Sequence, residues 1–361
     1  MNREIIIVAP SLDTRQNVSG ISAVTNFIIG NNHEYEYIHF QQGKSDIDHG
    51  FYTRLKRICV AYNQWKQLLK DHPNDIIHFN FPLDTPSIIR DFFFIRYAYR
   101  KKRKIVVHIH GGLFLFKNER PAVIDFLLKK IFLNDITFIA LSNLEKEKLV
   151  NSFGCKKVEV LPNCVNLEDA KNFERGNKDL DKLEILYLGR IEPNKGIDYI
   201  LKACEVLKTE GEKYSVHLAG IDQMGGYKER FRNALGSRFV DEGVVSGKKK
   251  NEILRKCNVF LMPSFYEGLP MSLLECMSYG MVPVVTNVGS IGQYVRNGEN
   301  GYIVKVKDVD SIVMALNEIQ GNRESAFMMG QKAKQTIFEE FSPIKYIDKL
   351  NEIYSYIRLE N

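Results

Sequence analysis

Short apolar runs alternate with longer amphipathic stretches along the whole chain. In the first half, the apolar runs that predict buried strands lie at residues 5–8, 76–79, 105–109 and 138–141. The amphipathic stretches between them predict helices after Ser19 and over residues 87–100. This alternation is typical of parallel sheets with helical crossovers.

The same alternation resumes in the second half. Strands are predicted at residues 184–188, 216–219, 259–261 and 282–286, with helices at 197–207, at 249–256 and from Met271. Between the halves, residues 161–182 are polar and poorly periodic, which indicates a linker. We therefore expect α/β domains at residues 1–165 and 183–340, a linker at 166–182 and a final helix within 341–361.

Composition narrows the class of protein. The 361 residues are 44% hydrophobic and 26% charged, which is ordinary for a folded chain of about two domains. The net charge of +6 is modest for this length, so we expect no nucleic-acid partner. The six cysteines stand singly, without the spacing of a zinc site, and predict reduced thiols. Neither a signal peptide nor an apolar run of about 18 residues is present, which favours a cytoplasmic location.

Two cations follow a predicted strand in the segment LYLGRIEPNKG, at Arg190 and Lys195. Open α/β sheets bind ligands at the carboxyl ends of their strands, and an arginine with a lysine suits a diphosphate. The alternative is that both side chains are solvated loop residues. This pair alone does not decide between the two interpretations.

Two acidic residues stand eight positions apart in PSFYEGLPMSLLECMSYGMVPVV, with Glu267 on a loop and Glu275 on the helix that follows. Gly268 and Leu269 can present backbone N–H groups at the start of that helix, where anions bind favourably. The alternative is that both carboxylates only complement the helix dipole. The apolar neighbours of Glu275 favour a buried, functional role over that alternative.

Taken together, these motifs resemble the donor-binding half of the family 4 retaining glycosyltransferases. The matching segments are GRIEPNKG, the glutamate segment quoted above, and VGSIGQYVRNGENGYIV. The resemblance implies the GT-B fold, in which two Rossmann-like domains face each other across a cleft and a C-terminal helix returns to the N-terminal domain. It also implies that neither a cofactor nor a metal is required.

The resemblance assigns roles in the second half of the chain. Arg190 and Lys195 would bind the donor diphosphate and neutralise the leaving group, and Glu275 would hold the ribose. Glu267 would face the donor sugar as a further catalytic residue. The remaining donor-binding positions that the resemblance implies are Gly220, Val245, Gly268 and Leu269.

In the first half, His110 ends the strand in KIVVHIHGG and matches the catalytic histidine of the family. Gly20 in NVSGISAV matches the family's glycine loop, although Ser19 stands where relatives have a second glycine. Asn80 and Gln293 stand where relatives often carry other polar groups, and their roles stay open.

The function implied is the transfer of a hexose or N-acetylhexosamine from a UDP-sugar, with retention, to a glycan or polyprenyl-linked oligosaccharide. Bacterial capsule, exopolysaccharide or O-antigen synthesis would use such a reaction. Two alternatives remain, namely a GT-B epimerase of UDP-N-acetylglucosamine and a scaffold that binds sugar nucleotides without catalysis.

Basic and aromatic residues interleave in FYTRLKRICVAYNQWKQLLK and DFFFIRYAYRKKRK, at residues 51–70 and 91–104. This composition suits peripheral contact with the anionic inner face of the cytoplasmic membrane. Crossover helices with a buried aromatic side explain the two segments equally well.

Overall fold

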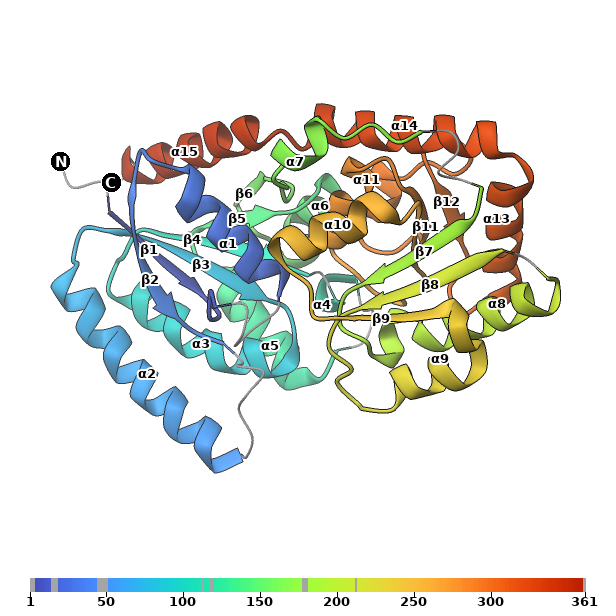
Figure 1. The fold of residues 1–361 in the computed structure, drawn as a ribbon. Coiled ribbons are helices and arrows are strands. Elements are labelled where there is room, and N and C mark those ends of the chain that lie inside the picture. The colour runs from blue at the N-terminus through green and yellow to red at the C-terminus, as the bar shows by residue number, and fades with distance from the viewer. Residues whose placement is uncertain are drawn as a thin grey trace. The chain divides into compact units, whose positions relative to one another are not determined.

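The structure, a computed structural model, describes residues 4–13, 19–43, 51–111, 113–116, 120–176, 181–211 and 213–359 (Figure 1). The chain forms two compact units. The N-terminal unit comprises Met1–Asn163 together with Pro343–Asn361, and the C-terminal unit comprises Cys164–Ser342. The end of the chain therefore belongs to the unit that its beginning forms.

The N-terminal unit is built on a six-stranded sheet in which every strand pair is parallel. Its strands are β1 (Glu4–Ala9), β2 (Glu36–Gln41), β3 (Ile76–Pro82), β4 (Ile105–His110), β5 (Thr137–Ala140) and β6 (Lys157–Val160). The spatial order is β2-β1-β3-β4-β5-β6, so the order reverses between β1 and β3. Ligands bind open α/β sheets at such a reversal, outside the carboxyl ends of the strands.

The helices of this unit are α1 (Gly20–Asn31), α2 (Phe51–Asp71), α3 (Thr85–Arg100), α4 (Leu113–Phe116), α5 (Ala122–Phe132), α6 (Asn143–Phe153) and α15 (Pro343–Leu359). Side chains of Ser19, Asp84 and Ser142 cap α1, α3 and α6 by accepting a backbone N–H. The last helix, α15, is fixed to the sheet by Tyr354, whose hydroxyl lies 2.6 Å from Nδ1 of His78 on β3.

The C-terminal unit repeats this plan with a second parallel sheet of six strands. Its strands are β7 (Leu183–Leu188), β8 (Tyr214–Ala219), β9 (Phe239–Gly243), β10 (Val259–Met262), β11 (Val282–Thr286) and β12 (Tyr302–Val304). The spatial order is β12-β11-β10-β7-β8-β9, and the reversal falls between β7 and β10.

The helices of the C-terminal unit are α7 (Glu168–Lys171), α8 (Ile197–Thr209), α9 (Tyr227–Leu235), α10 (Gly247–Lys256), α11 (Met271–Ser278), α12 (Ile291–Tyr294), α13 (Val309–Gly321) and α14 (Arg323–Glu340). Two short 3-10 turns, η2 (Pro193–Lys195) and η3 (Gly236–Arg238), complete it. The apolar side of α8 is buried as its spacing predicted, with Ile197, Ile200, Leu201, Cys204 and Leu207 in the core.

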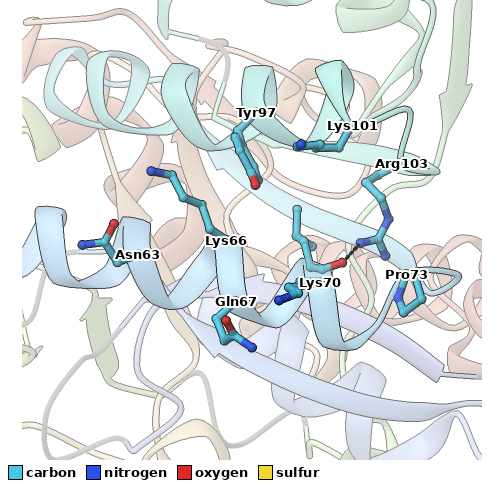
Figure 2. Close-up of a pocket in the computed structure, with 9 residues that line it drawn as sticks. Asn63, Lys66, Gln67, Lys70, Pro73, Tyr97, Lys101 and Arg103 are labelled. Carbon is cyan, nitrogen blue, oxygen red and sulfur yellow. Dashed lines mark hydrogen bonds between the residues drawn. The ribbon is translucent and has the colours of Figure 1, made fainter.

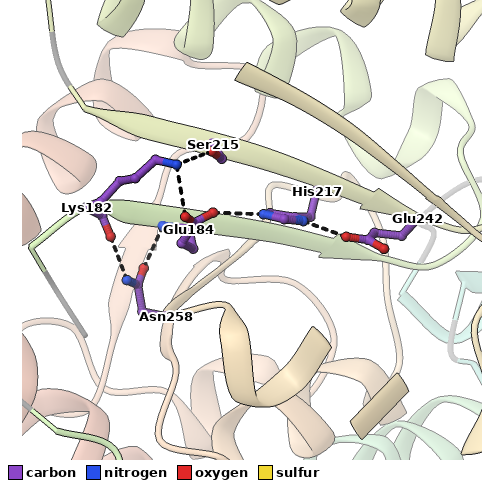
Figure 3. A network of polar contacts seen from close by, with 6 residues as sticks. All are labelled: Lys182, Glu184, Ser215, His217, Glu242 and Asn258. Carbon is purple, nitrogen blue, oxygen red and sulfur yellow. Dashed lines mark hydrogen bonds and ion pairs between the residues drawn. The ribbon is translucent and has the colours of Figure 1, made fainter. Parts of the chain in front are cut away.

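A buried polar network ties three strands of this sheet together (Figure 3). His217 on β8 is fully buried, and its ring nitrogens lie 2.7 Å from a carboxylate oxygen of Glu242 and 2.8 Å from one of Glu184. Burial by itself raises the pKa of Glu184, but hydrogen bonds from His217 and Lys182 outweigh it and lower that pKa to about 2. The network thus holds charge inside the sheet through complete pairing.

Candidate functional site

Most of the predicted site residues lie at the carboxyl edge of the C-terminal sheet. Arg190 and Lys195 follow β7, and Glu267 follows β10, which is the neighbour of β7 where the strand order reverses. The Nζ atom of Lys195 lies 2.8 Å from Oε1 of Glu267, and the two side chains are 22% and 11% exposed. The structure therefore brings this cation and this carboxylate together from positions 72 residues apart.

The loop that carries Lys195 is held tightly against the loop after β10. The backbone N–H of Phe265 donates to the carbonyl oxygen of Asn194 at 2.8 Å. Gly196 has a φ of +74°, and a Cβ at this position would lie 2.2 Å from the carbonyl oxygen of Pro263. Only glycine fits there, and the close approach sets the direction from which Lys195 reaches Glu267.

A second loop, after β11, supports Glu267 from the other side. The hydroxyl of Thr286 donates to the carbonyl of Ser264, and the N–H of Ser290 donates to that of Gly268. A Cβ on Gly289 would lie 2.1 Å from the carbonyl oxygen of Glu267. Sequence reasoning gave Gly289 no role, although the VGSIG segment that contains it was recognised as part of the family pattern.

Glycines occupy the ends of three neighbouring strands in this unit. The N–H of Gly189 donates to Ala219 at 3.0 Å, and the N–H of Gly220 donates to Gly243 at 2.8 Å. A Cβ on Gly220 would lie 1.8 Å from the carbonyl oxygen of Gly189. Because these residues have no side chains, a ligand can approach the backbone closely at this edge. Val245 follows β9 and is half-buried.

Glu275 on α11 differs from the sequence-based expectation. Its neighbours Leu274 and Cys276 are buried, but the Glu275 side chain is 21% exposed and already paired, with Oε1 2.7 Å from Nζ of Lys250. The helix turns the carboxylate outward while its neighbours face the core. Lys250 lies on α10, and sequence reasoning did not identify it because it is 25 positions from its partner.

The other predicted positions of this unit lie close to those already described. Arg190 is half-buried, and its carbonyl oxygen accepts a hydrogen bond from the Tyr187 hydroxyl at 2.5 Å. Gly268 is half-buried in the Glu267 loop, and Leu269 is 3% exposed. Leu269 therefore offers backbone rather than side chain to a ligand.

In the N-terminal unit, His110 lies at the end of β4 and is 9% exposed. Its Nε2 atom is 2.7 Å from Oδ1 of Asn80, and Nδ2 of Asn80 donates to the carbonyl of Val8 at 2.9 Å. Burial, with a contribution from His78, lowers the pKa of His110 to about 3. His110 is therefore a neutral imidazole at physiological pH.

Two more buried histidines lie beside His110. Nε2 of His78 is 3.2 Å from Nδ1 of His108, and the rings of His108 and His110 are 4.1 Å apart between centroids. Burial lowers the pKa of His78 to about 3 and that of His108 well below its ordinary value. All three rings therefore pack as neutral polar groups, which a low-dielectric interior requires.

Gly20 is the first residue of α1, directly after the capping residue Ser19. The Ser19 hydroxyl accepts the N–H of Ser22 at 3.2 Å, so the serine that replaces a family glycine ends the loop and starts the helix. Residues 14–18 of the glycine loop and Gly112 lie outside the described part of the chain.

Three residues in the N-terminal unit offer the donor atoms of a metal site, Glu4, His72 and Asp75. These side chains pair with one another, because Nδ1 of His72 lies 2.9 Å from Asp75 and 3.4 Å from Glu4. Asp75 and His72 also offer backbone carbonyls to Arg103. The group thus closes the turn before β3. That the enzyme works without a metal stays a prediction.

Two family models match consecutive parts of the chain. Residues 29–169 match the model described as Glycosyltransferase Family 4, and residues 168–336 match Glycosyl transferases group 1. The chain belongs to the family 4 glycosyltransferases. The resemblance seen in the sequence motifs is thereby confirmed.

Relatives of this glycosyltransferase include proteins from archaea and bacteria. An uncharacterized glycosyltransferase of Methanocaldococcus jannaschii is 29% identical over 220 residues, and the match spans 56% of each chain. The UDP-Gal:alpha-D-GlcNAc-diphosphoundecaprenol alpha-1,3-galactosyltransferase of Escherichia coli is 25% identical over 269 residues, which is 69% of this chain and 68% of the relative.

Solved structures match the fold of the whole chain. Sucrose-phosphate synthase of Thermosynechococcus elongatus superposes with a TM-score of 0.78 at 16% identity, covering 99% of both chains. HepE of Anabaena superposes with a TM-score of 0.74 at 13% identity, covering 98% of this chain and all of HepE. The expected GT-B fold class of two parallel α/β sheets is confirmed. Within the described residues, no helix has the length and apolar character needed to span a membrane.

Proposed function

We propose that this family 4 enzyme transfers a hexose or N-acetylhexosamine from a UDP-sugar, with retention of anomeric configuration, to a glycan or polyprenyl-linked oligosaccharide. The acceptor would belong to capsule, exopolysaccharide or O-antigen synthesis. The observation that carries the proposal is the Lys195–Glu267 pair at the reversal between β7 and β10. This pair brings a cation and a carboxylate together at the position where α/β sheets hold ligands, and this supports the proposal.

Lys195 and Arg190 supply the charge that the reaction needs. Cleavage of the bond between sugar and diphosphate develops negative charge on the departing UDP, and a fixed cation stabilises that charge most in the transition state. We assign this role to both residues. In the free protein Glu267 holds Lys195 in position, and the diphosphate would take over part of that pairing.

The glycine-rich edge and Glu275 provide the remaining donor contacts. We place the diphosphate and nucleoside near Gly189, Gly220 and Val245, where side chains are absent or short, and the ribose hydroxyls at Glu275. Because Lys250 pairs with one oxygen of Glu275, the other oxygen can accept hydrogen bonds from hydroxyl groups. From the N-terminal unit, we assign His110 as a catalytic residue and the amide of Gly20 as a donor contact. We assign no metal to the reaction.

A uridine donor is supported by the comparisons. HepE has been crystallised with UDP and with UDP-glucose, and the E. coli relative is named for a UDP-galactose donor and a diphosphoundecaprenol-linked acceptor. We propose the same classes of donor and acceptor here. Because such acceptors are membrane-bound, the enzyme would work at the inner face of the cytoplasmic membrane.

A two-stage experiment tests this function. First, a panel of nucleotide sugars is screened for protection against thermal unfolding, since a ligand at about 100 times its Kd stabilises a protein by about 2.7 kcal/mol. We expect UDP-sugars to protect and GDP- and CMP-sugars to have no effect. The protecting donor, radiolabelled in the sugar, is then incubated with a bacterial lipid extract, and label in the lipid phase is counted.

The two alternatives give different results in the same assay. An epimerase consumes the donor without lipid extract, and a scaffold binds the donor without releasing UDP. A transferase releases UDP in step with labelled lipid, and an α-linked product from an α-linked donor demonstrates retention. Formation of a product with inverted anomeric configuration would exclude the proposed retaining mechanism.

A further inference from the structure

A cavity of about 470 Å³ lies between α2 and α3 of the N-terminal unit (Figure 2). It is lined by the last turns of both helices and by Pro73 and Arg103, which precede β3 and β4. His110 lies at the other, carboxyl end of β4. The cavity is therefore separate from the candidate catalytic residues of this unit.

Four cationic side chains line this cavity. Lys66 and Lys70 stand one turn apart on α2, Lys101 caps α3, and Arg103 follows it. Figure 2 shows Lys66 and Lys101 on either side of Tyr97, with Lys70 farther along α2. Charges of one sign gathered at a concave surface attract an anion more strongly than the same charges on a flat surface.

Lys66, Lys70 and Lys101 have no acidic partner among the residues that the structure describes, and two of them contact aromatic rings. Nζ of Lys66 lies 4.4 Å from the ring centroid of Tyr62, and Nζ of Lys101 lies 5.8 Å from that of Tyr97. The nearby carboxylate of Asp71 is held by the amide of Gln67, at 2.8 and 3.1 Å. Three ammonium groups are therefore available to a ligand.

Arg103 has a different part in this cavity. Its guanidinium donates to the carbonyls of Leu69, His72 and Asp75 at the end of α2, and burial lowers its pKa. It thus fixes the wall of the cavity and satisfies the last carbonyls of the helix. Lys66 stands more than one turn before the end of α2, where the helix dipole does not account for it.

Exposed apolar side chains on the same two helices, one or two turns before residues that line the cavity, indicate what kind of anion the cavity meets. Phe93 stands one turn before Tyr97 on α3, Ile89 one turn earlier, and Val60 one turn before Asn63 on α2. They are 55%, 43% and 48% exposed. Cations beside exposed aromatic and aliphatic groups suit the interface of a bilayer. A soluble phosphate, in contrast, would make no contact with the apolar groups.

We propose that this cavity binds the phosphate of an anionic phospholipid headgroup, while Phe93 and Ile89 enter the interfacial layer. The lysines would recognise the charge, and the cavity would make the contact local rather than a diffuse attraction. This inference does not depend on the chemistry proposed for the C-terminal unit.

The test compares two triple variants of the full chain. The cavity variant carries Lys66→Gln, Lys70→Gln and Lys101→Gln. The matched control carries Lys146→Gln, Lys148→Gln and Lys156→Gln, which remove the same charge from the same unit away from the cavity. Binding is measured by co-sedimentation with vesicles of phosphatidylcholine alone or mixed with phosphatidylglycerol.

We expect the wild type and the control to bind the mixed vesicles and the cavity variant to lose roughly 100-fold in affinity, about fivefold for each lysine near the surface. Phe93→Ser should weaken vesicle binding by the same factor at low and at high salt, because it removes an apolar contact that salt does not screen. Equal losses in both triple variants, or no vesicle binding by the wild type, would overturn the proposal. So would binding of inorganic phosphate alone that competes with the vesicles, since the ligand would then be a free anion.

A parallel measurement separates this proposal from the enzymatic one. Thermal protection by the UDP-sugar should be the same in the wild type and both triple variants, because none of the substituted lysines is assigned to donor binding. If the UDP-sugar protects the wild type normally but the wild type does not bind vesicles, only the proposed headgroup site is overturned. A protein that binds vesicles but is not protected by any nucleotide sugar overturns the proposed function alone.

Discussion

The Nε2 atom of His110 lies 2.7 Å from Oδ1 of Asn80, and the amide nitrogen of Asn80 is committed to the carbonyl of Val8. Because that amide can donate only through its nitrogen, its oxygen must face the histidine. Nε2 of His110 therefore carries the proton, and Nδ1 is left as the acceptor. Asn80, for which the sequence left the role open, fixes the tautomer of the proposed catalytic histidine.

Replacing Asn80 by aspartate should change the pH dependence of the enzyme. A carboxylate 2.7 Å from Nε2 favours the charged imidazolium, so the pKa of His110 should rise from about 3 toward neutrality. We expect kcat/KM of Asn80→Asp to fall as the pH drops below about 7, where the wild type shows no titration of His110.

Asn80→Ala is the matched control, since it removes the contact without adding a charge. It should lower kcat by about tenfold at every pH, because the tautomer is no longer fixed. The same pH profile for Asn80→Asp and the wild type would show that His110 has no part in the reaction.

Lys250 should matter to donor binding although it lies outside the recognised motifs. Its Nζ is 2.7 Å from Glu275, which we assign to the ribose. Lys250→Met frees that carboxylate to move, so we expect the KM for the donor to rise about five- to tenfold with kcat little changed. Lys256→Met, on the exposed side of the same helix, provides the control. An unchanged KM for Lys250→Met would contradict the assignment of Glu275 to the ribose.

Glu145 should make the protein less stable as the pH rises. Burial raises its pKa from 4.5 to about 7, against the opposing hydrogen bond from Leu141. The folded state thus holds a proton that the unfolded state has lost between these values, and stability falls as the pH rises through this range. Above about pH 7 we expect Glu145→Gln to be about 2–3 kcal/mol more stable than the wild type. Equal denaturant midpoints at pH 8 would contradict this assignment.

The Glu184 network should act in the opposite direction. Its pKa is lowered to about 2 from 4.5, so its stabilisation is complete above 4.5 and is lost as the pH falls toward 2. Solvent screens this half-buried group, and we expect Glu184→Gln to cost about 1 kcal/mol at pH 7. The difference from the wild type should be smaller at pH 3 and should vanish only near pH 2, which thermal unfolding at pH 7, 3 and 2 will reveal.

Central strands could be predicted from the sequence and edge strands could not. The inner strands β1, β3, β4, β7, β10 and β11 are mostly apolar because helices cover both of their faces. The edge strands β9 and β12 are short and partly exposed, with residues such as Asp241 and Glu242, so they have no apolar run to detect. The long helices α13 and α14 were not predicted either, since neither contains a recognised functional motif.

The site divides in the same way. Sequence motifs pointed to Lys195 and Glu267 one by one, because each stands after a recognisable strand. Their pairing, the contact of Lys250 with Glu275, and the support of Glu267 by Gly289 depend on backbone approaches between distant segments. No periodicity within one segment carries that information.

The rate of sugar transfer by Lys195→Met, at saturating UDP-sugar and lipid extract, tests the central claim most directly. Lys202→Met, on an exposed turn of the following helix, is the control. If Lys195 stabilises the departing diphosphate, kcat should fall by about 100- to 1,000-fold while UDP still protects the variant against unfolding. Transfer by Lys195→Met at the rate of the wild type and of Lys202→Met would contradict the account.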